Sequence, residues 1–167
     1  MDRRVFSYGL AGLVIVLDRV TKLWIERSVG LWDRHTVIPG FFDIVHTQNR
    51  GMAFGLFADG DSRLRSVLLI GVALVVLVIV ASLIWRMPRE FVPDGRTARL
   101  SLGLVLGGAV GNLWDRIFRG SVTDFLDFHA GGYHWPAFNV ADSAITVGAA
   151  LLAFGLLRAG PARSQEA

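Results

Sequence analysis

The uncharged run from Ser66 to Trp85 limits most strongly what this chain can fold into. It is about 20 residues long, and an apolar helix of that length crosses the hydrocarbon core of a bilayer. Three more apolar stretches, each with few charges, accompany it along the chain. We therefore predict an all-α membrane protein with a single domain, residues 1–167, and four transmembrane helices at about 5–25, 66–85, 98–116 and 138–158.

The composition supports this class and excludes others. The residues are 53% hydrophobic and 19% charged, which is typical of a small polytopic membrane protein rather than of a soluble domain. The net charge of +3 comes from dispersed arginines without a dense basic run, so we expect no nucleic-acid binding. The absence of cysteine excludes a thiol nucleophile, a disulfide framework and thiolate metal sites.

The distribution of basic residues predicts the orientation of the spans. Two arginines precede the first apolar run, as in a signal peptide, but a charged pair at 18–19 interrupts the place where cleavage would occur. We therefore expect an uncleaved first span. Lysine and arginine are denser in the first five residues, in 86–99 and after Leu157 than in the other loops. This pattern predicts cytoplasmic termini and places the other loops on the outer side.

The outer loop at 29–60 has the composition of short strands. His35–Gly40 and Phe41–His46 are β-rich and are joined by a Pro-Gly turn signal, so we predict a small β-sheet on the outer face. Glycines in the next segment, Asn49–Gly55, permit close approach of the backbone. Leu56–Arg65 is predicted to form a short interfacial helix.

Polar side chains within the predicted spans gather near the outer ends of the helices. They are Asp18, Lys22, Asn112, Asp115, Arg116, Asn139 and Asp142, with Asp124 in the loop before the last span. Ionisable groups at such a depth are costly and usually functional. Gly103, Gly107 and Gly111 form a separate stripe of small residues, which predicts close packing of the third helix on a neighbour.

Asp124 and Asp142 are the candidates for a catalytic pair. Two close carboxylates cannot readily both ionise, so such a pair holds one proton. The charged member would activate water against a peptide carbonyl, and the protonated member would donate to the carbonyl oxygen and then to the leaving amine. The alternative is that Asp142 caps the fourth helix and Asp124 is solvated. Sequence spacing leaves both interpretations open.

The other charged residues in the spans suggest support rather than chemistry. Asp18 and Lys22 are four residues apart on one helix face, and Asp115 is followed by Arg116, so we predict a structural ion pair within each set. A contact between Arg116 and a substrate carbonyl or carboxylate is the alternative.

Three asparagines are candidates for hydrogen bonding at the same site. Asn112 and Asn139 are expected to brace the acids through their amides. Asn49, which is followed by glycines, would bind the substrate backbone or make a turn.

Other chemistries fit the sequence less well. His129 and His134 suggest a metal site, but their spacing matches no standard ligand pattern, so we expect neither a metal nor a cofactor. Ser143 lacks a histidine in any span that would activate it. A proton-coupled transporter or channel is the main rival function, since embedded acids also relay protons. Such a path needs polar groups through the whole membrane, and the inner halves of the spans are apolar.

At these residues the chain resembles the lipoprotein signal peptidases, the signal peptidase II family of bacterial inner-membrane aspartic proteases. The resemblance runs along the whole chain and consists of five motifs in order: Asp18–Lys22, Asn49–Gly55, Gly107–Arg116, Gly120–Phe125 and Phe138–Ile145. Each motif alone is modest, but five in the same order are highly specific.

The resemblance implies a function and a set of site residues. Asp124 and Asp142 would be the catalytic dyad, supported by Asp18, Lys22, Asn49, Gly51, Phe54, Asn112, Asp115, Arg116 and Asn139. The substrate would be a prolipoprotein that carries a diacylglyceryl group on the cysteine after the cut. We expect a monomer in the bacterial inner membrane, in contact with membrane lipid, with no metal or cofactor, and inhibited by globomycin bound at the dyad.

Overall fold

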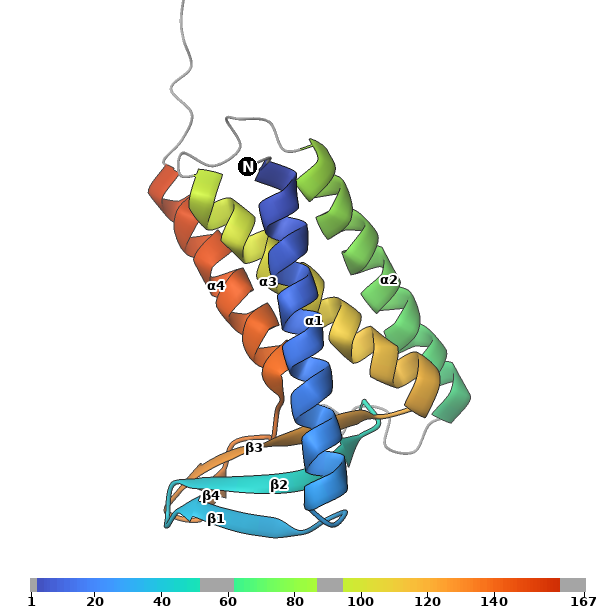
Figure 1. The fold of residues 1–167 in the computed structure, drawn as a ribbon, viewed down its shortest axis with the longest axis vertical. Helices are drawn as coiled ribbons and strands as arrows, with labels where there is room; N and C mark the ends of the chain where they lie inside the picture. Colours follow the sequence, from blue (N-terminus) through green and yellow to red (C-terminus); the bar gives the residue numbers. More distant parts are fainter. Residues whose placement is uncertain (1–2, 52–61, 87–94, 160–167) are drawn as a thin grey trace, which may run out of the picture.

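The structure, a computed structural model, describes residues 3–51, 62–86 and 95–159. Its four long helices are α1 (Arg3–Ser28), α2 (Ser62–Arg86), α3 (Gly95–Arg119) and α4 (Val140–Ala159). An antiparallel sheet has the strand order β1 (Arg34–Ile38), β2 (Phe42–Asn49), β3 (Val122–Ala130) and β4 (Tyr133–His134). Figure 1 shows the sheet across one end of the bundle, with the start of α1 and the end of α4 at the other end.

The four helices cover the four predicted spans, and two of them are long and apolar enough to cross a membrane. These are Leu64–Arg86, with a mean hydropathy of 3.3, and Val140–Arg158, with 1.9. The other two, α1 and α3, carry several charged residues in the halves nearer the sheet, which lowers their hydropathy. The mostly helical fold with a small sheet is as predicted, and apolar spans are clear for α2 and α4.

The sheet is larger than the sequence predicted. The two strands expected in the outer loop are present as β1 and β2, and Gly40 in the turn between them has φ 75°. We predicted a loop between the last two spans, but β3 and β4 lie there and β3 pairs with β2. Asp124 and Asp127 gave this segment a loop-like composition, because aspartate is disfavoured in strands. Pairing with β2 overrides that local preference.

Two predictions concern residues outside the described ranges. Most of the interfacial helix expected at 56–65 falls there, and the residues from Ser62 onward belong to α2 instead. Phe54 also lies outside the described part of the chain. Its supporting role therefore stays a prediction.

Glycines allow α3 to pack closely against two helices at once. A Cβ on Gly107 would lie 2.7 Å from the carbonyl oxygen of Ala11 in α1, and a Cβ on Gly148 of α4 would lie 2.7 Å from the carbonyl oxygen of Ser101 in α3. Gly111 faces Asp18, whose Oδ2 would be 2.7 Å from an added Cβ. The predicted glycine stripe therefore lets α3 pack closely on α1, and Gly148 lets α4 pack closely on α3.

Two apolar clusters lie on either side of the polar ends of α1, α3 and α4. Away from the sheet, buried residues of α1, α2 and α3 pack together: Ala11, Val80, Ile84, Leu102 and Leu106. Near the sheet, Ile25 and Val29 pack against Phe125 of β3. Between the two clusters lie charged and amide side chains, and we call this region the polar layer. Its buried members are Asp18, Lys22, Asn112, Asp115, Asp124 and Asn139, and the half-buried Asp142 belongs to it as well.

Candidate active site

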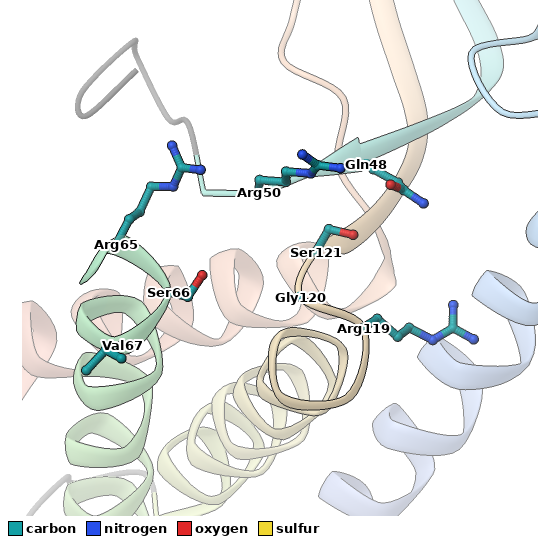
Figure 2. Close-up of a pocket in the computed structure, with 8 residues that line it drawn as sticks. All are labelled: Gln48, Arg50, Arg65, Ser66, Val67, Arg119, Gly120 and Ser121. Atoms are coloured by element: carbon teal, nitrogen blue, oxygen red, sulfur yellow. The ribbon is translucent and has the colours of Figure 1, made fainter. Parts of the chain in front are cut away.

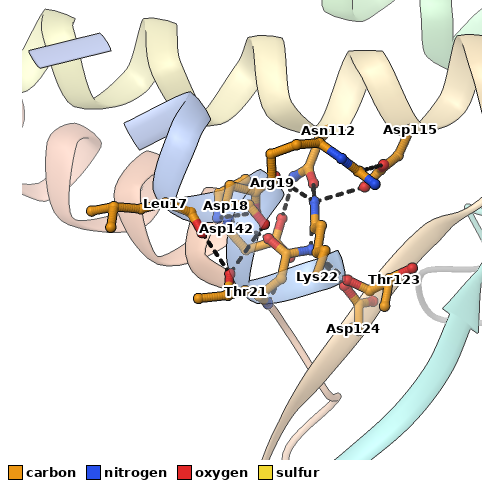
Figure 3. A network of polar contacts seen from close by, with 12 residues as sticks. Leu17, Asp18, Arg19, Thr21, Lys22, Asn112, Asp115, Thr123, Asp124 and Asp142 are labelled. Carbon is orange, nitrogen blue, oxygen red and sulfur yellow. Dashed lines mark hydrogen bonds and ion pairs between the residues drawn. The ribbon is translucent and has the colours of Figure 1, made fainter. Parts of the chain in front are cut away.

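Lys22 is the centre of the polar layer. It is fully buried, and its ammonium Nζ lies 2.7 Å from Oδ2 of Asp18, 2.8 Å from Oδ2 of Asp115 and 3.1 Å from Oδ1 of Asn112 (Figure 3). Arg19 adds a second cation, with NH1 2.5 Å from Oδ1 of Asp115. Two carboxylates thus meet two cations, which offsets the cost of burying the charges.

The predicted ion pair between Asp18 and Lys22 is present, but the one between Asp115 and Arg116 was wrong. Asp115 pairs with Lys22 and Arg19 of α1 instead. Successive residues on a helix point about 100° apart, so two neighbours do not face each other. Arg19 was missed by the sequence analysis. Arg19 lies three residues before Lys22, which places both cations on one face of α1. This spacing could have identified Arg19 as a second partner of Asp115.

Asn139 connects the two candidate catalytic aspartates. Its amide Nδ2 donates to Oδ1 of Asp124 over 2.7 Å, and its Oδ1 accepts from the backbone N–H of Asp142 over 2.9 Å. The carboxylate of Asp142 accepts in return from the backbone N–H of Asn139, at 3.3 Å. This reciprocal pattern is a capping box at the start of α4. Asp142 therefore caps α4, as in the alternative interpretation from the sequence. It is also linked to Asp124 through Asn139.

Asn112 links the Lys22 cluster to Asp142. An ammonium can only donate, so the amide oxygen of Asn112 must face Lys22 and its NH₂ group must face away. That NH₂ group donates to Oδ1 of Asp142 over 2.7 Å. The buried charge of Lys22 thus orients the Asn112 amide so that its NH₂ group faces Asp142.

The environment of Asp124 favours its protonated form. The side chain is 2% exposed, and burial together with the charge of Asp142 raises the pKa of Asp124 to about 7. Hydrogen bonds from Asn49 and Asn139 act in the opposite direction. Asp124 in β3 can therefore hold a proton near neutral pH, and Asp142, which is half-buried, is open to a small molecule such as water.

Asn49 and Arg116 complete the surroundings of the pair. The sequence left two roles open for Asn49, a turn or a contact with the substrate backbone. The structure has the turn, because Oδ1 of Asn49 accepts from the N–H of Gly51, which has φ 86°. Asn49 also hydrogen-bonds Asp124. Arg116 donates from NH1 to the backbone oxygen of Asn112 over 3.2 Å, and its buried Nε has no hydrogen-bond partner in the described part of the chain. That N–H is available to a substrate.

The residues considered for other chemistries have partners of their own. His129 Nε2 lies 3.2 Å from Asp43, and His134 Nδ1 lies 3.0 Å from Asp127, so both histidines pair with acids of the sheet. Ser143 donates its hydroxyl to the backbone oxygen of Asn139 over 2.9 Å.

Comparisons with known proteins identify the family of the chain. Residues 10–158 match the family model Peptidase_A8, described as signal peptidase (SPase) II. The chain is 47% identical to the lipoprotein signal peptidase of Solibacter usitatus, covering 94% of this chain and 93% of that protein. It is 44% identical to the lipoprotein signal peptidase of Maridesulfovibrio salexigens, covering 86% and 92%.

The fold is also similar to that of a solved protein. A bacterial membrane enzyme determined by the in meso method at 2.3 Å resolution superposes with a TM-score of 0.78 and 27% identity, over 96% of this chain and 93% of that one. The family match includes most of α1, nearly all of α4, all of α2, α3 and the sheet, and both aspartates. The chain therefore belongs to the signal peptidase II family of membrane-bound peptidases.

Proposed function

We propose that this chain is an aspartic endopeptidase that removes the signal peptide from prolipoproteins, cutting before a cysteine that carries a diacylglyceryl group. The observation that carries the proposal is the connection of Asp124 to Asp142 through Asn139. The names of the relatives, lipoprotein signal peptidases, support the substrate class.

In this mechanism the two aspartates differ in protonation. Asp124, whose pKa is raised to about 7, holds the proton, and Asp142 in the first turn of α4 is ionised. Asp142 takes a proton from water as the water oxygen bonds to the scissile carbonyl carbon. Asp124 hydrogen-bonds the carbonyl oxygen and then protonates the amine as the C–N bond breaks. The proton on Asp142 returns to Asp124, and the pair is restored.

Neighbouring side chains would hold the substrate in register. The free N–H of Arg116 is suited to the carbonyl or carboxylate of a bound peptide. Asn49 is exposed beside Asp124 and can meet the peptide backbone together with Gly51. We assign a structural role to Asp18, Lys22 and Asp115, because they neutralise one another.

The proposal includes the placement in the membrane. All four helices span it, with the sheet on the outer side and both termini on the cytoplasmic side of a bacterial inner membrane. A diacylglyceryl anchor would keep the scissile bond near the lipid–water boundary, at the depth of the polar layer. The anchored substrate then reaches the enzyme by diffusion in the plane of the membrane. Orienting it at the site costs less entropy than orienting a substrate free in solution. The working form is a monomer, and globomycin would inhibit it by occupying the dyad.

The rival function, a proton-coupled transporter, gains no support. The buried acids stop at the polar layer, and the cluster around Leu102 and Leu106 beyond it is apolar. A proton path would need polar groups there as well.

The test is cleavage by the purified protein of a precursor with and without the diacylglyceryl group, followed by mass spectrometry. We expect a product that begins with the lipidated cysteine, and little product from the unlipidated precursor. Equal cleavage of both precursors, or a cut at another bond, would contradict the proposed specificity.

A further inference from the structure

A cavity whose described lining includes no aspartate lies at the same end of the bundle as the polar layer. Its volume is about 550 Å³, and it lies between the end of β2, the first turns of α2 and the connection from α3 to β3 (Figure 2). The residues that line it are Gln48, Arg50, Arg65, Ser66, Val67, Arg119, Gly120 and Ser121. The proposed peptidase mechanism uses none of them.

The described part of the cavity lining is positively charged. Figure 2 shows Arg50, which directly follows β2, and Arg65 of α2 on two sides of it. Arg119 contributes a third guanidinium to the lining, but that group forms an ion pair with Glu26 of α1. No carboxylate occurs among the described lining residues. Such a cavity favours an anion, and guanidinium groups in particular match the geometry of phosphate oxygens.

A buried hydroxyl adds a donor at the base of the cavity. Ser121 is 8% exposed and makes no side-chain hydrogen bond within the described residues. It lines the cavity on the side of the connection from α3 to β3, and Ser66 lines it on the side of α2 (Figure 2). A buried polar group of this kind usually has a partner, so the hydroxyl is available to a ligand oxygen.

The cavity continues into an apolar strip along α2. Val67 lines the cavity and is 65% exposed. Gly71, Val75 and Val78 follow at helical spacing on the same face and are also exposed. An acyl chain that starts at the cavity can therefore lie along this face.

We propose that the cavity binds an anionic phospholipid of the leaflet on the sheet side. Arg50, Arg65 and Ser121 hold its headgroup phosphate, and one acyl chain lies along α2 from Val67. Basic pockets beside membrane-spanning helices recognise lipid headgroups by this chemistry. The proposal does not depend on the assignment of the catalytic pair.

The test measures lipid binding by native mass spectrometry of the purified full-length protein. Short-chain phosphatidylglycerol is titrated against phosphatidylcholine with the same acyl chains, and glycerol phosphate serves as a soluble anion without chains. We expect phosphatidylglycerol to bind most tightly. Arg50→Gln and Arg65→Gln should each weaken it about tenfold, from the loss of one charged hydrogen-bonding contact. Arg65→Lys should retain most of the binding.

The matched control is Arg27→Gln, which removes the same charge from an exposed residue in the last turn of α1. It should leave phosphatidylglycerol binding unchanged, and thermal unfolding should show that every variant is folded. Unchanged binding in Arg50→Gln and Arg65→Gln, or an equal loss in Arg27→Gln, would overturn the proposal. Glycerol phosphate binding as tightly as the lipid would also overturn it, because the site would then serve a free anion.

Discussion

Two pairs of carboxylates share the polar layer, and their partners differ. Asp18 and Asp115 each contact the ammonium of Lys22 within 2.8 Å. Asp124 and Asp142 are instead held by amides and form no ion pair within the described part of the chain. A carboxylate beside a cation stays ionised, whereas one held by neutral amides can exchange a proton. From this difference in partners we infer a structural pair at Asp18 and Asp115 and a reactive pair, the proposed catalytic one, at Asp124 and Asp142.

Removing a carboxylate from the reactive pair should have the largest effect. We expect Asp124→Asn and Asp142→Asn each to lower cleavage of a diacylated precursor by about 10³-fold or more, because general acid–base transfer is lost. Cleavage rates by mass spectrometry, with Asp33→Asn in an exposed loop as the control, provide the measurement. Near-full activity in either variant of the pair would contradict the dyad.

Breaking the structural pair should act on stability first. Lys22→Met would leave Asp18 and Asp115 buried without their shared cation, at a cost of about 3–5 kcal/mol. Thermal unfolding in detergent should show a large decrease in Tm. Lys22→Arg, which keeps the charge, is the control and should retain more of the stability. An unchanged Tm in Lys22→Met would mean that the ion pairs do not hold the helices together.

The pH dependence of cleavage distinguishes the reactive pair in a second way. The rate should follow a bell-shaped curve, with a fall above about pH 7 as Asp124 loses its proton. The hydrogen bond from Asn49 lowers the pKa of Asp124, so Asn49→Ala should raise that pKa and move the alkaline limb to higher pH. A flat profile between pH 5 and 9, or a shift to lower pH, would be inconsistent with this role.

A further effect concerns stability and pH. The pKa of Asp124 is raised from 3.8 to about 7 in the folded chain, so the folded state binds more protons than the unfolded state between these values. Stability from this residue is therefore lost as pH rises from about 4 to 7. Asp124→Asn should remove that decline, which Tm measured across this range would detect. A parallel decline in the variant would assign the effect to other groups.

The sequence predicted most of the fold because its signals are local. Helix length and hydropathy indicated the four helices, and the glycine spacing in α3 indicated the close packing that is observed. Strand β3 could not be predicted, since its pairing with β2 joins residues about 80 positions apart and composition does not encode such contacts. For the same reason the partner of Asp115 was misassigned to its neighbour Arg116 rather than to α1.

The candidate site was predictable to a similar degree. Helical spacing placed Asn112 and Asn139 near the acids, and hydrogen bonds now connect them. The raised pKa of Asp124 could not be predicted, because it depends on its burial and on the nearby charge of Asp142. From the sequence, a cap at the start of the fourth helix was one of two alternative roles for Asp142.

The capping box has a practical consequence for capturing a substrate. Replacing Asp142 disturbs both the chemistry and the first turn of α4, since its carboxylate accepts the Asn139 N–H. Asp124 lies in β3 and does not cap α4. An inactive enzyme intended to retain an uncut precursor for structure determination is therefore better made at Asp124, where loss of turnover leaves the docking surface in place.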